Sequence, residues 1–334
     1  GRRHLQPERQ RRTPGALATH VQRCRRAILG DLRVVAQNPQ RRTKINVVLF
    51  SGGSGTQSIT EAFLRHPQIS LKILINAYDD GHSTGRLRRF LPGMLGPSDV
   101  RKNLSRLMPV VERGQKALKL VSDFRLPVDI PRADALAIVD RIIAGEFHLL
   151  PEKIAAAFPK IAHWQLRTLA GYLETFRNYF YRQEELGRAF NFTDCALGNL
   201  FFAGCYLEQD LDFNRTIDAF SAFHEVQQGI LLNVTQGENL FLVAEKENGH
   251  VLLNEADIVA AQDTAKIREL FLVDEATYLH KIENQAEPES GWLALVREGD
   301  RVPQMADAEE VVALAGRREG VELSGLVLNE KGWE

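Results

Sequence analysis

The residues most able to do chemistry lie in two short loops, each directly after an apolar run. Residues 51–56 read Ser-Gly-Gly-Ser-Gly-Thr, and residues 78–89 contain an adjacent aspartate pair and three arginines. Glycines let a backbone approach a phosphate closely, and hydroxyl groups add donors. Two adjacent carboxylates can hold Mg²⁺ while phosphate oxygens complete its shell. Together the two loops predict a phosphate-binding site with a divalent cation.

The glycine-rich loop lies between a predicted strand, residues 45–50, and a helical pattern with Ile59 and Phe63 on one side. The strand is β-branched and apolar, which is typical of burial on both faces of a parallel sheet. The loop lacks the lysine of the triphosphatase phosphate loop, and GxGxxG has Ser58 where its third glycine belongs. The alternative is a tight turn without a ligand. The predicted phosphate contacts are Gly52, Gly53, Ser54, Gly55 and Thr56.

The aspartate-pair loop follows a second predicted strand, residues 71–77. Because ligands of open parallel sheets lie beyond the carboxyl ends of the strands, we expect both loops at one edge. Asp79 and Asp80 are the candidate metal ligands, and either could take a proton from an attacking hydroxyl. The forked donors of arginine suit a diphosphate. The expected contacts in this loop are Ser83, Gly85 and Arg86. The alternative is a turn beside solvated arginines.

Two later segments predict helices that begin near the same site. Residues 96–103 predict a helix with Ser98 or Asp99 as its N-cap, and Asp99 and Arg101 would border the ligand. Residues 194–200 predict another helix, capped by Thr193 or Asp194, which presents Asn199. For each segment the alternative is a capped helix without a ligand. Further downstream we predict strands at 229–234, 240–244, 251–253, 292–296 and 325–328, and a helix at 255–270.

These segments, in this order, resemble the family of 2-phospho-L-lactate transferases and the related gluconeogenesis-factor proteins. The glycine loop is similar to the family's GGGTG or GGTGT, and residues 79–88 are similar to DDGGSSGRLR of its regulatory branch. Residues 96–102 resemble PPGDIRN, residues 194–200 resemble GHSLGNL, and residues 248–258 resemble DGRVVRGESEI. The resemblance covers about residues 45–110 and 190–260.

The resemblance implies a Rossmann-like α/β fold: a three-layer core with a mainly parallel sheet and an inserted helical subdomain. One branch of the family transfers a phospholactyl-type group from a guanosine diphosphate conjugate to a deazaflavin alcohol with Mg²⁺. The other branch binds UDP-sugars and acts as a regulator. By matched position, the glycine loop would meet the diphosphate, Asp79 and Asp80 the metal and the acceptor hydroxyl, and Asn199 the nucleotide.

The chain also departs from the family's pattern. His82 stands in place of a glycine, and Cys195-Ala196 stands in place of His-Ser. Residues 270–334 show no counterpart of the family's late glycine-rich phosphate segment.

The 334 residues suffice for two domains, and 44% apolar with 25% charged residues excludes a disordered chain. Residues 1–44 hold eleven arginines and one lysine against two acids, a net charge of +10, which leaves −11 for the rest. An apolar stripe from Leu17 to Val35 predicts that this arm is a helix that packs on the protein's own core. The alternatives are an organelle-targeting peptide or contact with an anionic partner.

We expect four parts: the basic helical arm 1–44, the first part of the nucleotide-binding core 45–110, a helical insertion 111–190, and the remainder of the core 191–334. The insertion shows helical spacing and could cover the ligand. Its aromatic residues could line a flat-ring acceptor site, although core packing is the commoner reason for such spacing. They are Trp164, Tyr172, Phe176, Tyr179, Phe180 and Tyr181.

No segment approaches the ~18 apolar residues of a membrane span, and the three cysteines form no CxxC pair. We therefore expect a cytoplasmic protein without a membrane partner. Nucleic acid is not expected, since no aromatic residue interrupts the N-terminal arginines; a homo-oligomer stays open. The predicted function is a Mg²⁺-dependent transferase acting on a nucleotide diphosphate conjugate. A non-catalytic UDP-sugar-binding regulator is the main alternative, and a nicotinamide oxidoreductase with Asp79 on a ribose is another.

Overall fold

The computed structural model describes residues 44–52, 55–76, 78–108, 113–235, 237–253, 257–258, 260, 265–283, 292–293 and 296. The described residues belong to one compact unit, apart from Lys44, Ile45 and Pro67–Ser70, which belong to another. The predicted basic arm up to residue 43, Gly53, Ser54 and the predicted strand 325–328 lie outside the described residues.

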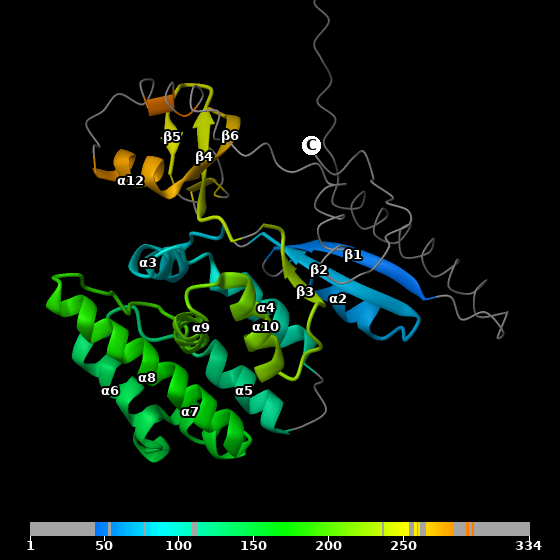
Figure 1. Cartoon of the computed structure of the whole chain (residues 1–334), viewed down its shortest axis with the longest axis vertical. Helices are drawn as coiled ribbons and strands as arrows, with labels where there is room; N and C mark the ends of the chain where they lie inside the picture. The colour runs from blue at the N-terminus through cyan, green and yellow to red at the C-terminus, as the bar shows by residue number, and fades with distance from the viewer. Residues whose placement is uncertain are drawn as a thin grey trace, which may run out of the picture. The chain divides into compact units, whose positions relative to one another are not determined.

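The first sheet is three-stranded, in the order β1 (Ile45–Ser51), β2 (Ile69–Ile75), β3 (Leu231–Asn233), with α2 (Gln57–Leu64) between β1 and β2 in sequence (Figure 1). β2 pairs with β3 in parallel, with Ile73 opposite Leu231. The strands predicted at 45–50, 71–77 and 229–234 are therefore confirmed. The expectation that β1 is buried on both faces is wrong: most of its residues are half-buried and Phe50 is exposed. β3, the other outer strand, is fully buried and contacts α4 and α10, so the cover by helices rather than the position in the sheet decides burial here.

Helices make up most of residues 82–223. They are α3 (His82–Phe90), α4 (Pro97–Leu107), α5 (Arg113–Asp123), α6 (Arg132–Ala144), α7 (Glu152–Ala155), α8 (His163–Glu185), α9 (Leu197–Glu208) and α10 (Phe213–Phe223), with short 3₁₀ turns at Phe147–Leu149 and Phe158–Lys160. The helical spacing predicted for residues 110–190 is confirmed in its described part. α4 and α10 contact β3, and α9 contacts α4, α5, α8 and α10. These contacts place α4 and α10 next to the sheet and α9 next to both helices.

An aromatic core fills the space between α3, α8 and the segment that leads into α9. Phe90 packs against Phe176 and Phe180 of α8, and Phe190 packs edge-on against Phe192 with centroids 4.9 Å apart. Phe176 and Phe180 are fully buried, whereas Trp164 and Tyr181 on the same helix are exposed. The buried aromatic residues of α8 therefore belong to the core.

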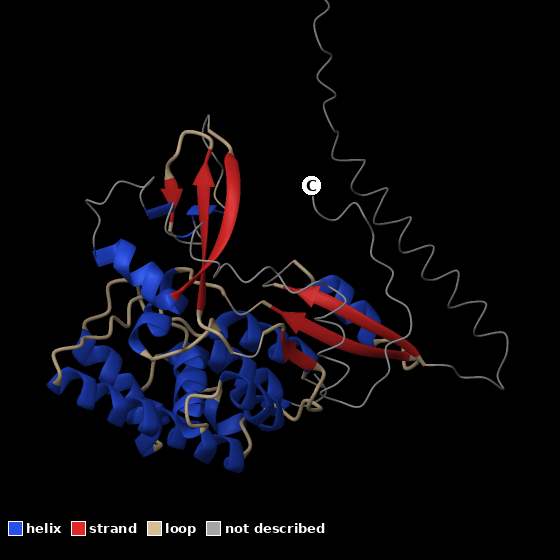
Figure 2. Cartoon of the chain, turned by 45° about the horizontal axis from the view of Figure 1, so that its top comes forward, coloured by secondary structure: helices blue, strands red, loops and turns tan. Residues whose placement is uncertain are grey.

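The strands after residue 239 form a second, antiparallel sheet. β4 (Leu240–Lys246) pairs with β5 (Val251–Leu252) and β6 (Ile267–Asp274), and α12 (Glu275–Glu283) follows; Figure 2 shows the two groups of strands. The first sheet agrees with the parallel sheet expected for the core, and β4, β5 and β6 form a separate antiparallel sheet. The helix predicted for 255–270 is wrong at its end, because residues 267–270 pair with β4.

The strand predicted at 292–296 is also wrong, because the residues described there, Trp292, Leu293 and Val296, are helical. All three are buried in one cluster with Phe241 and Tyr278. Tertiary packing against the second sheet decides the conformation of this short apolar run.

Candidate functional site

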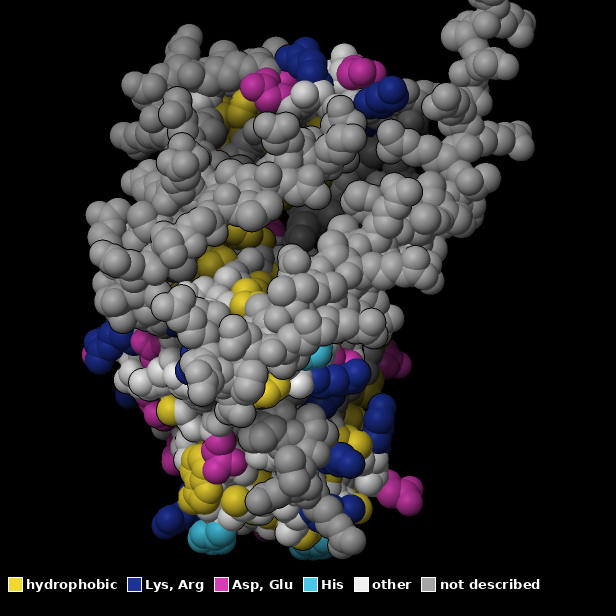
Figure 3. Space-filling model, turned by 90° about the vertical axis from the view of Figure 1, so that its right-hand side faces the viewer, with side chains coloured by type: hydrophobic (Ala, Val, Ile, Leu, Met, Phe, Trp, Pro, Cys, Tyr) yellow, Lys and Arg dark blue, Asp and Glu magenta, His cyan; other side chains and the backbone are white. Residues whose placement is uncertain are grey.

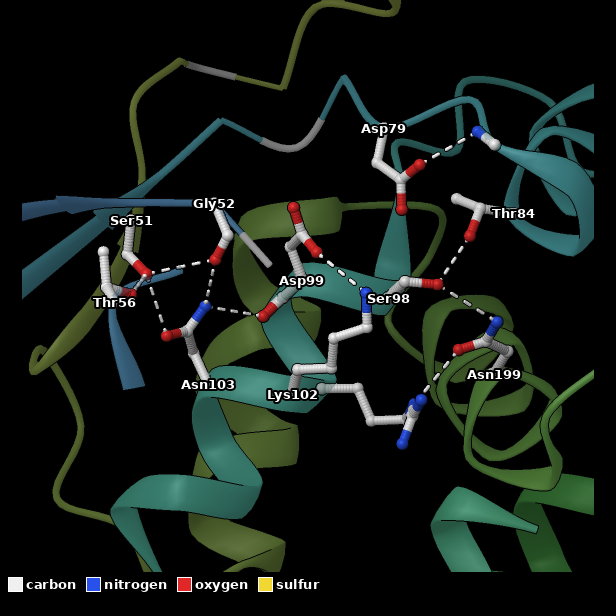
Figure 4. Close-up of polar contacts among 12 residues, drawn as sticks. Ser51, Gly52, Thr56, Asp79, Thr84, Ser98, Asp99, Lys102, Asn103 and Asn199 are labelled. Carbon is white, nitrogen blue, oxygen red and sulfur yellow. Dashed lines mark hydrogen bonds and ion pairs between the residues drawn. The ribbon is translucent and has the colours of Figure 1, made fainter. Parts of the chain in front are cut away.

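The glycine loop is fastened to α4 at the carboxyl end of β1. The buried Ser51 hydroxyl donates to Asn103 Oδ1 at 3.1 Å and lies 2.5 Å from the hydroxyl of Thr56 (Figure 4). Asn103 in turn donates to the carbonyl of Gly52 at 3.2 Å. A Cβ on Gly52 would lie 3.9 Å from Asp99 Oδ2. The backbone at Gly52 therefore faces the first turn of α4. Asn103 was not among the predicted site residues, although its polar side chain lies one helical turn after Asp99 in the sequence.

The first turn of α4 carries a carboxylate that lies close to Gly52. The N-cap predicted at Ser98 or Asp99 is wrong: Gly96 is the N-cap, and Pro97 takes the first helical position, which suits its fixed φ. Asp99 is therefore inside the helix, 8% exposed, with its Oδ1 3.3 Å from Lys102 Nζ. Burial raises the pKa of Asp99, the ammonium of Lys102 opposes that rise, and the charge of Asp79 adds to it.

Asp79 and Asp80 are neighbours in sequence with different surroundings. Asp79 is half-buried, and its Oδ1 accepts a hydrogen bond from the backbone N–H of Gly81 at 2.9 Å. The second carboxylate oxygen of Asp79 points away from this bond (Figure 4). Asp79 is also close enough to Asp99 for its charge to shift the pKa of Asp99.

Asp80, in contrast, is held by protein groups. Its carboxylate is buried, 3.1 Å from Arg89 Nη1 and 3.3 Å from the hydroxyl of Tyr278. Burial raises the pKa of Asp80, and the positive charge of Arg89 opposes that rise. A Cβ on Gly85 would lie 2.5 Å from the carbonyl oxygen of Asp80, so a glycine is required for this close packing. Of the predicted pair, Asp79 is therefore the one whose charge acts on Asp99 of α4.

The arginines of the predicted cluster contact different parts of the protein. Arg88 is fully buried, donates to the carbonyl of Tyr78 at 2.8 Å, and lies 4.0 Å from the centroid of the Phe241 ring. Arg86 donates to the carbonyl of Thr193, ahead of α9. The alternative of a solvated arginine face is therefore wrong for Arg88, which holds the start of the loop against β4.

A chain of buried hydrogen bonds links α3, α4 and α9. The hydroxyls of Thr84 and Ser98 lie 2.5 Å apart, and the amide of Asn199 donates to Ser98 at 3.3 Å. Arg101 Nε donates to Asn199 Oδ1 at 3.1 Å and pairs with Asp123 of α5. The structure thus brings Asn199 and Arg101 beside the predicted site, with the amide of Asn199 fully buried and bonded to protein groups.

Other residues predicted for the site or for its helix caps lie next to these hydrogen-bonded residues in the sequence. Ser83 is buried in the first turn of α3. The N-cap predicted at Thr193 or Asp194 for α9 is wrong, because α9 has Ala196 as its N-cap. Asp194 instead forms an ion pair with Arg125, 2.5 Å between Nε and Oδ1. The helix that holds Asn199 is thus fixed by packing and by Arg101 rather than by a side-chain cap.

The residues present fit a Mg²⁺ ion that takes few ligands from the protein. Within the described part of the chain, no group of three or more His, Cys, Asp or Glu side chains could hold a metal. Asp79 and Asp99 supply two carboxylates, and the charge of Asp79 raises the pKa of Asp99. Mg²⁺ commonly binds one or two carboxylates and completes its octahedron with phosphate oxygens and water. Asp80 fits less well, because Arg89 and Tyr278 already contact its carboxylate.

The described surface carries charges of both signs. On the face in Figure 3, acidic and basic side chains are interspersed among the described residues. Within the described ranges, no helix has the length and apolar character needed to cross a bilayer.

The α/β fold, with a glycine loop and carboxylates after parallel strands, defines a Rossmann-like protein. The model of the family described as 2-phospho-L-lactate transferase CofD matches residues 47–289. The chain belongs to this family.

Two solved structures from Bacillus halodurans are also similar. One, a member of the UPF0052 family, is 23% identical over 69% of this chain with a TM-score of 0.44, and the other is 21% identical over 70% with a TM-score of 0.41. This chain spans about half the length of each, 51% and 52%. A comparison with curated proteins gives no match.

Proposed function

We propose that this chain is a transferase of the 2-phospho-L-lactate transferase type, acting on a nucleotide diphosphate conjugate. The convergence of Gly52, Asp79 and Asp99 beyond β1 and β2 carries the proposal. The absence of a side chain at Gly52 suits a close phosphate, and two carboxylates suit a divalent cation. Membership of the family supports the same reaction class.

In this proposal the glycine loop, residues 52–56, binds the diphosphate. Asp79 and Asp99 would hold Mg²⁺, which would supply positive charge for the phosphate oxygens. The oxygen of an acceptor hydroxyl attacks the phosphorus of the transferred group. The bond from that phosphorus to the nucleoside monophosphate breaks, and the hydroxyl proton passes to solvent water.

The other predicted residues take supporting roles in this proposal. Asp80 holds the second loop through Arg89 and Tyr278. Arg101 and Asn199 fix the first turn of α4 through Ser98. Ser83, Gly85 and Arg86 border the second loop from α3, where Gly85 permits its close packing.

A regulator that binds a UDP-sugar without turning it over is the second candidate. The sequence of residues 79–88 favours this candidate, because it resembles the motif of the regulatory branch more closely than that of the enzymatic branch. The same loops would bind the nucleotide diphosphate, and a partner protein would recognise the ligand-bound form of the chain.

Turnover separates the two candidates. The protein is incubated with Mg²⁺, a hydroxyl acceptor and a guanosine or uridine diphosphate conjugate, and released nucleoside monophosphate is measured. We expect release that needs both acceptor and metal and falls by about 10²-fold or more in Asp79→Asn, since asparagine lacks the negative charge that would hold the metal. The exposed Asp129→Asn is the matched control.

Binding without turnover would instead favour the regulator. A conjugate present at about 100 times its Kd stabilises the fold by roughly 2.7 kcal/mol, which a melting curve detects. Such a shift with the conjugate recovered intact contradicts the transferase. No shift with either nucleotide contradicts both candidates.

A further inference from the structure

Lys102 places a positive charge beside the buried carboxylate at this site. It follows Asp99 by three residues on α4, and its Nζ lies 3.3 Å from Asp99 Oδ1. The side chain of Asp99 is 12% exposed, whereas that of Lys102 is 41% exposed. A lysine stem can lie along the protein surface while its ammonium reaches a partner. The carboxylate is therefore fixed, and the cation that contacts it can move.

We propose that Lys102 is an internal cation that Mg²⁺ displaces from Asp99, and that its released ammonium then binds the substrate's diphosphate. The inference rests on the proposed function of the same site. A divalent cation held by Asp79 and Asp99 repels an ammonium a few ångströms away. Gly52 and Lys102 lie on opposite sides of the Asp99 carboxylate (Figure 4), and both are close to it. An ammonium displaced from Asp99 therefore stays near the loop that would bind phosphate.

The proposal predicts opposite effects of one substitution on two ligands. Lys102→Gln removes the competing cation, so a divalent metal alone binds more tightly. It also removes a donor to phosphate, so a nucleoside diphosphate binds more weakly once metal is present. A lysine that only stabilises the fold would weaken both ligands, since both need an intact α4.

The experiment measures both affinities on the full chain. Free Mn²⁺ is followed by electron paramagnetic resonance, and GDP and UDP are then titrated calorimetrically at saturating Mn²⁺. We expect Lys102→Gln to lower the Kd of Mn²⁺ roughly tenfold and to raise that of the nucleotide roughly tenfold, the scale of one charge-assisted hydrogen bond.

Lys119→Gln is the matched control. The ammonium of Lys119 also pairs with a carboxylate on its own helix, Asp123 at 2.7 Å, and its side chain is 52% exposed. We expect it to change neither affinity by more than about twofold, as for an exposed ion pair. Lys102→Arg keeps the charge and should keep both affinities within about threefold.

Each result decides one part of the proposal. Mn²⁺ affinity that is unchanged or weaker in Lys102→Gln overturns the displacement. Nucleotide affinity that is unchanged in this variant overturns the phosphate contact. If the unsubstituted protein binds Mn²⁺ but neither nucleotide, the proposed function fails, whereas tighter Mn²⁺ binding by Lys102→Gln still supports the displacement at Asp99.

Discussion

Two regions of the molecule differ in what holds them together. The polar cluster, formed by Thr84, Ser98, Arg101 and Asn199, depends on hydrogen bonds, whereas the aromatic core beside α8 depends on apolar packing. Helix α9 contacts both regions. Its first turn places Asn199 among hydrogen-bonded groups, and Gly204 lies against the backbone of Tyr172 on α8. The aromatic core is held by close packing, so a change of volume should damage it. The polar cluster is held by directed hydrogen bonds, and at its rim Asp79 is half-buried and Lys102 is 41% exposed. Rigid packing on one side thus positions reactive groups on the other.

The largest effect is expected where α9 crosses α8. A Cβ on Gly204 would lie 1.9 Å from the carbonyl oxygen of Tyr172, and a backbone atom cannot move away cheaply. Gly204→Ala should therefore destabilise the fold by about 3 kcal/mol or more, measured by urea unfolding. Gly171→Ala on α8, where a Cβ would meet nothing within 4 Å, should instead be neutral or stabilise by up to ~1 kcal/mol. Equal effects of the two substitutions would contradict the tight crossing.

Acid should weaken the helical region through His224. Burial lowers the pKa of His224 to about 4, and its Nδ1 donates to the carbonyl of Phe220 at 2.7 Å. In the unfolded chain the imidazole of His224 is protonated below its ordinary pKa of about 6.5, whereas in the native protein it stays neutral until the pH is near 4. The stabilisation is thus complete above pH 6.5 and is lost as pH falls, by roughly 2 kcal/mol at pH 5.

The measurement for His224 is the urea midpoint at pH 7 and pH 5. His224→Gln should shrink the difference between the two pH values, while the exposed His163→Gln should leave it unchanged. A difference that persists in His224→Gln would assign the acid sensitivity to other groups.

Removing the side-chain amide of Asn199 from the polar cluster should lower the free energy of unfolding, although the side chain is small. Asn199→Ala leaves the buried Nε of Arg101 without its acceptor and removes the amide that donates to Ser98, which keeps only its hydrogen bond with Thr84. Because unsatisfied buried groups retain their desolvation penalty, we expect a loss of about 2 kcal/mol in unfolding free energy. The exposed Asn248→Ala is the control. A loss below roughly 0.5 kcal/mol, the range of surface substitutions, would show that water replaces the amide.

The smallest effect on stability is expected at Asp79. Asparagine keeps the oxygen that accepts from Gly81 N–H, so Asp79→Asn should change the free energy of unfolding by less than about 0.5 kcal/mol. The same variant should lose the metal-dependent melting shift with a nucleotide conjugate. A large loss of stability would place Asp79 with Asp80 among the structural residues.

Much of the fold could be predicted, because strands and helices follow local patterns. The β-branched runs at 45–50 and 71–77 and the helical spacing after residue 110 specify their own conformations. The segments that failed are short or ambiguous: residues 267–270 and Trp292 adopt the structure that their neighbours impose. The predicted caps at Ser98 and Asp194 failed because Gly96 and Ala196 begin those helices instead.

The sequence by itself determined which loops follow β1 and β2 and which residue types they carry, since the order of strand, loop and helix is encoded locally. Only the tertiary structure decided that Asp80 is held by Arg89 and Tyr278 while Asp79 faces Asp99. Tyr278 lies 198 positions from Asp80, and no periodicity reports such a contact. Adjacent carboxylates look identical in a sequence, and their different burial arises only when distant segments pack around them.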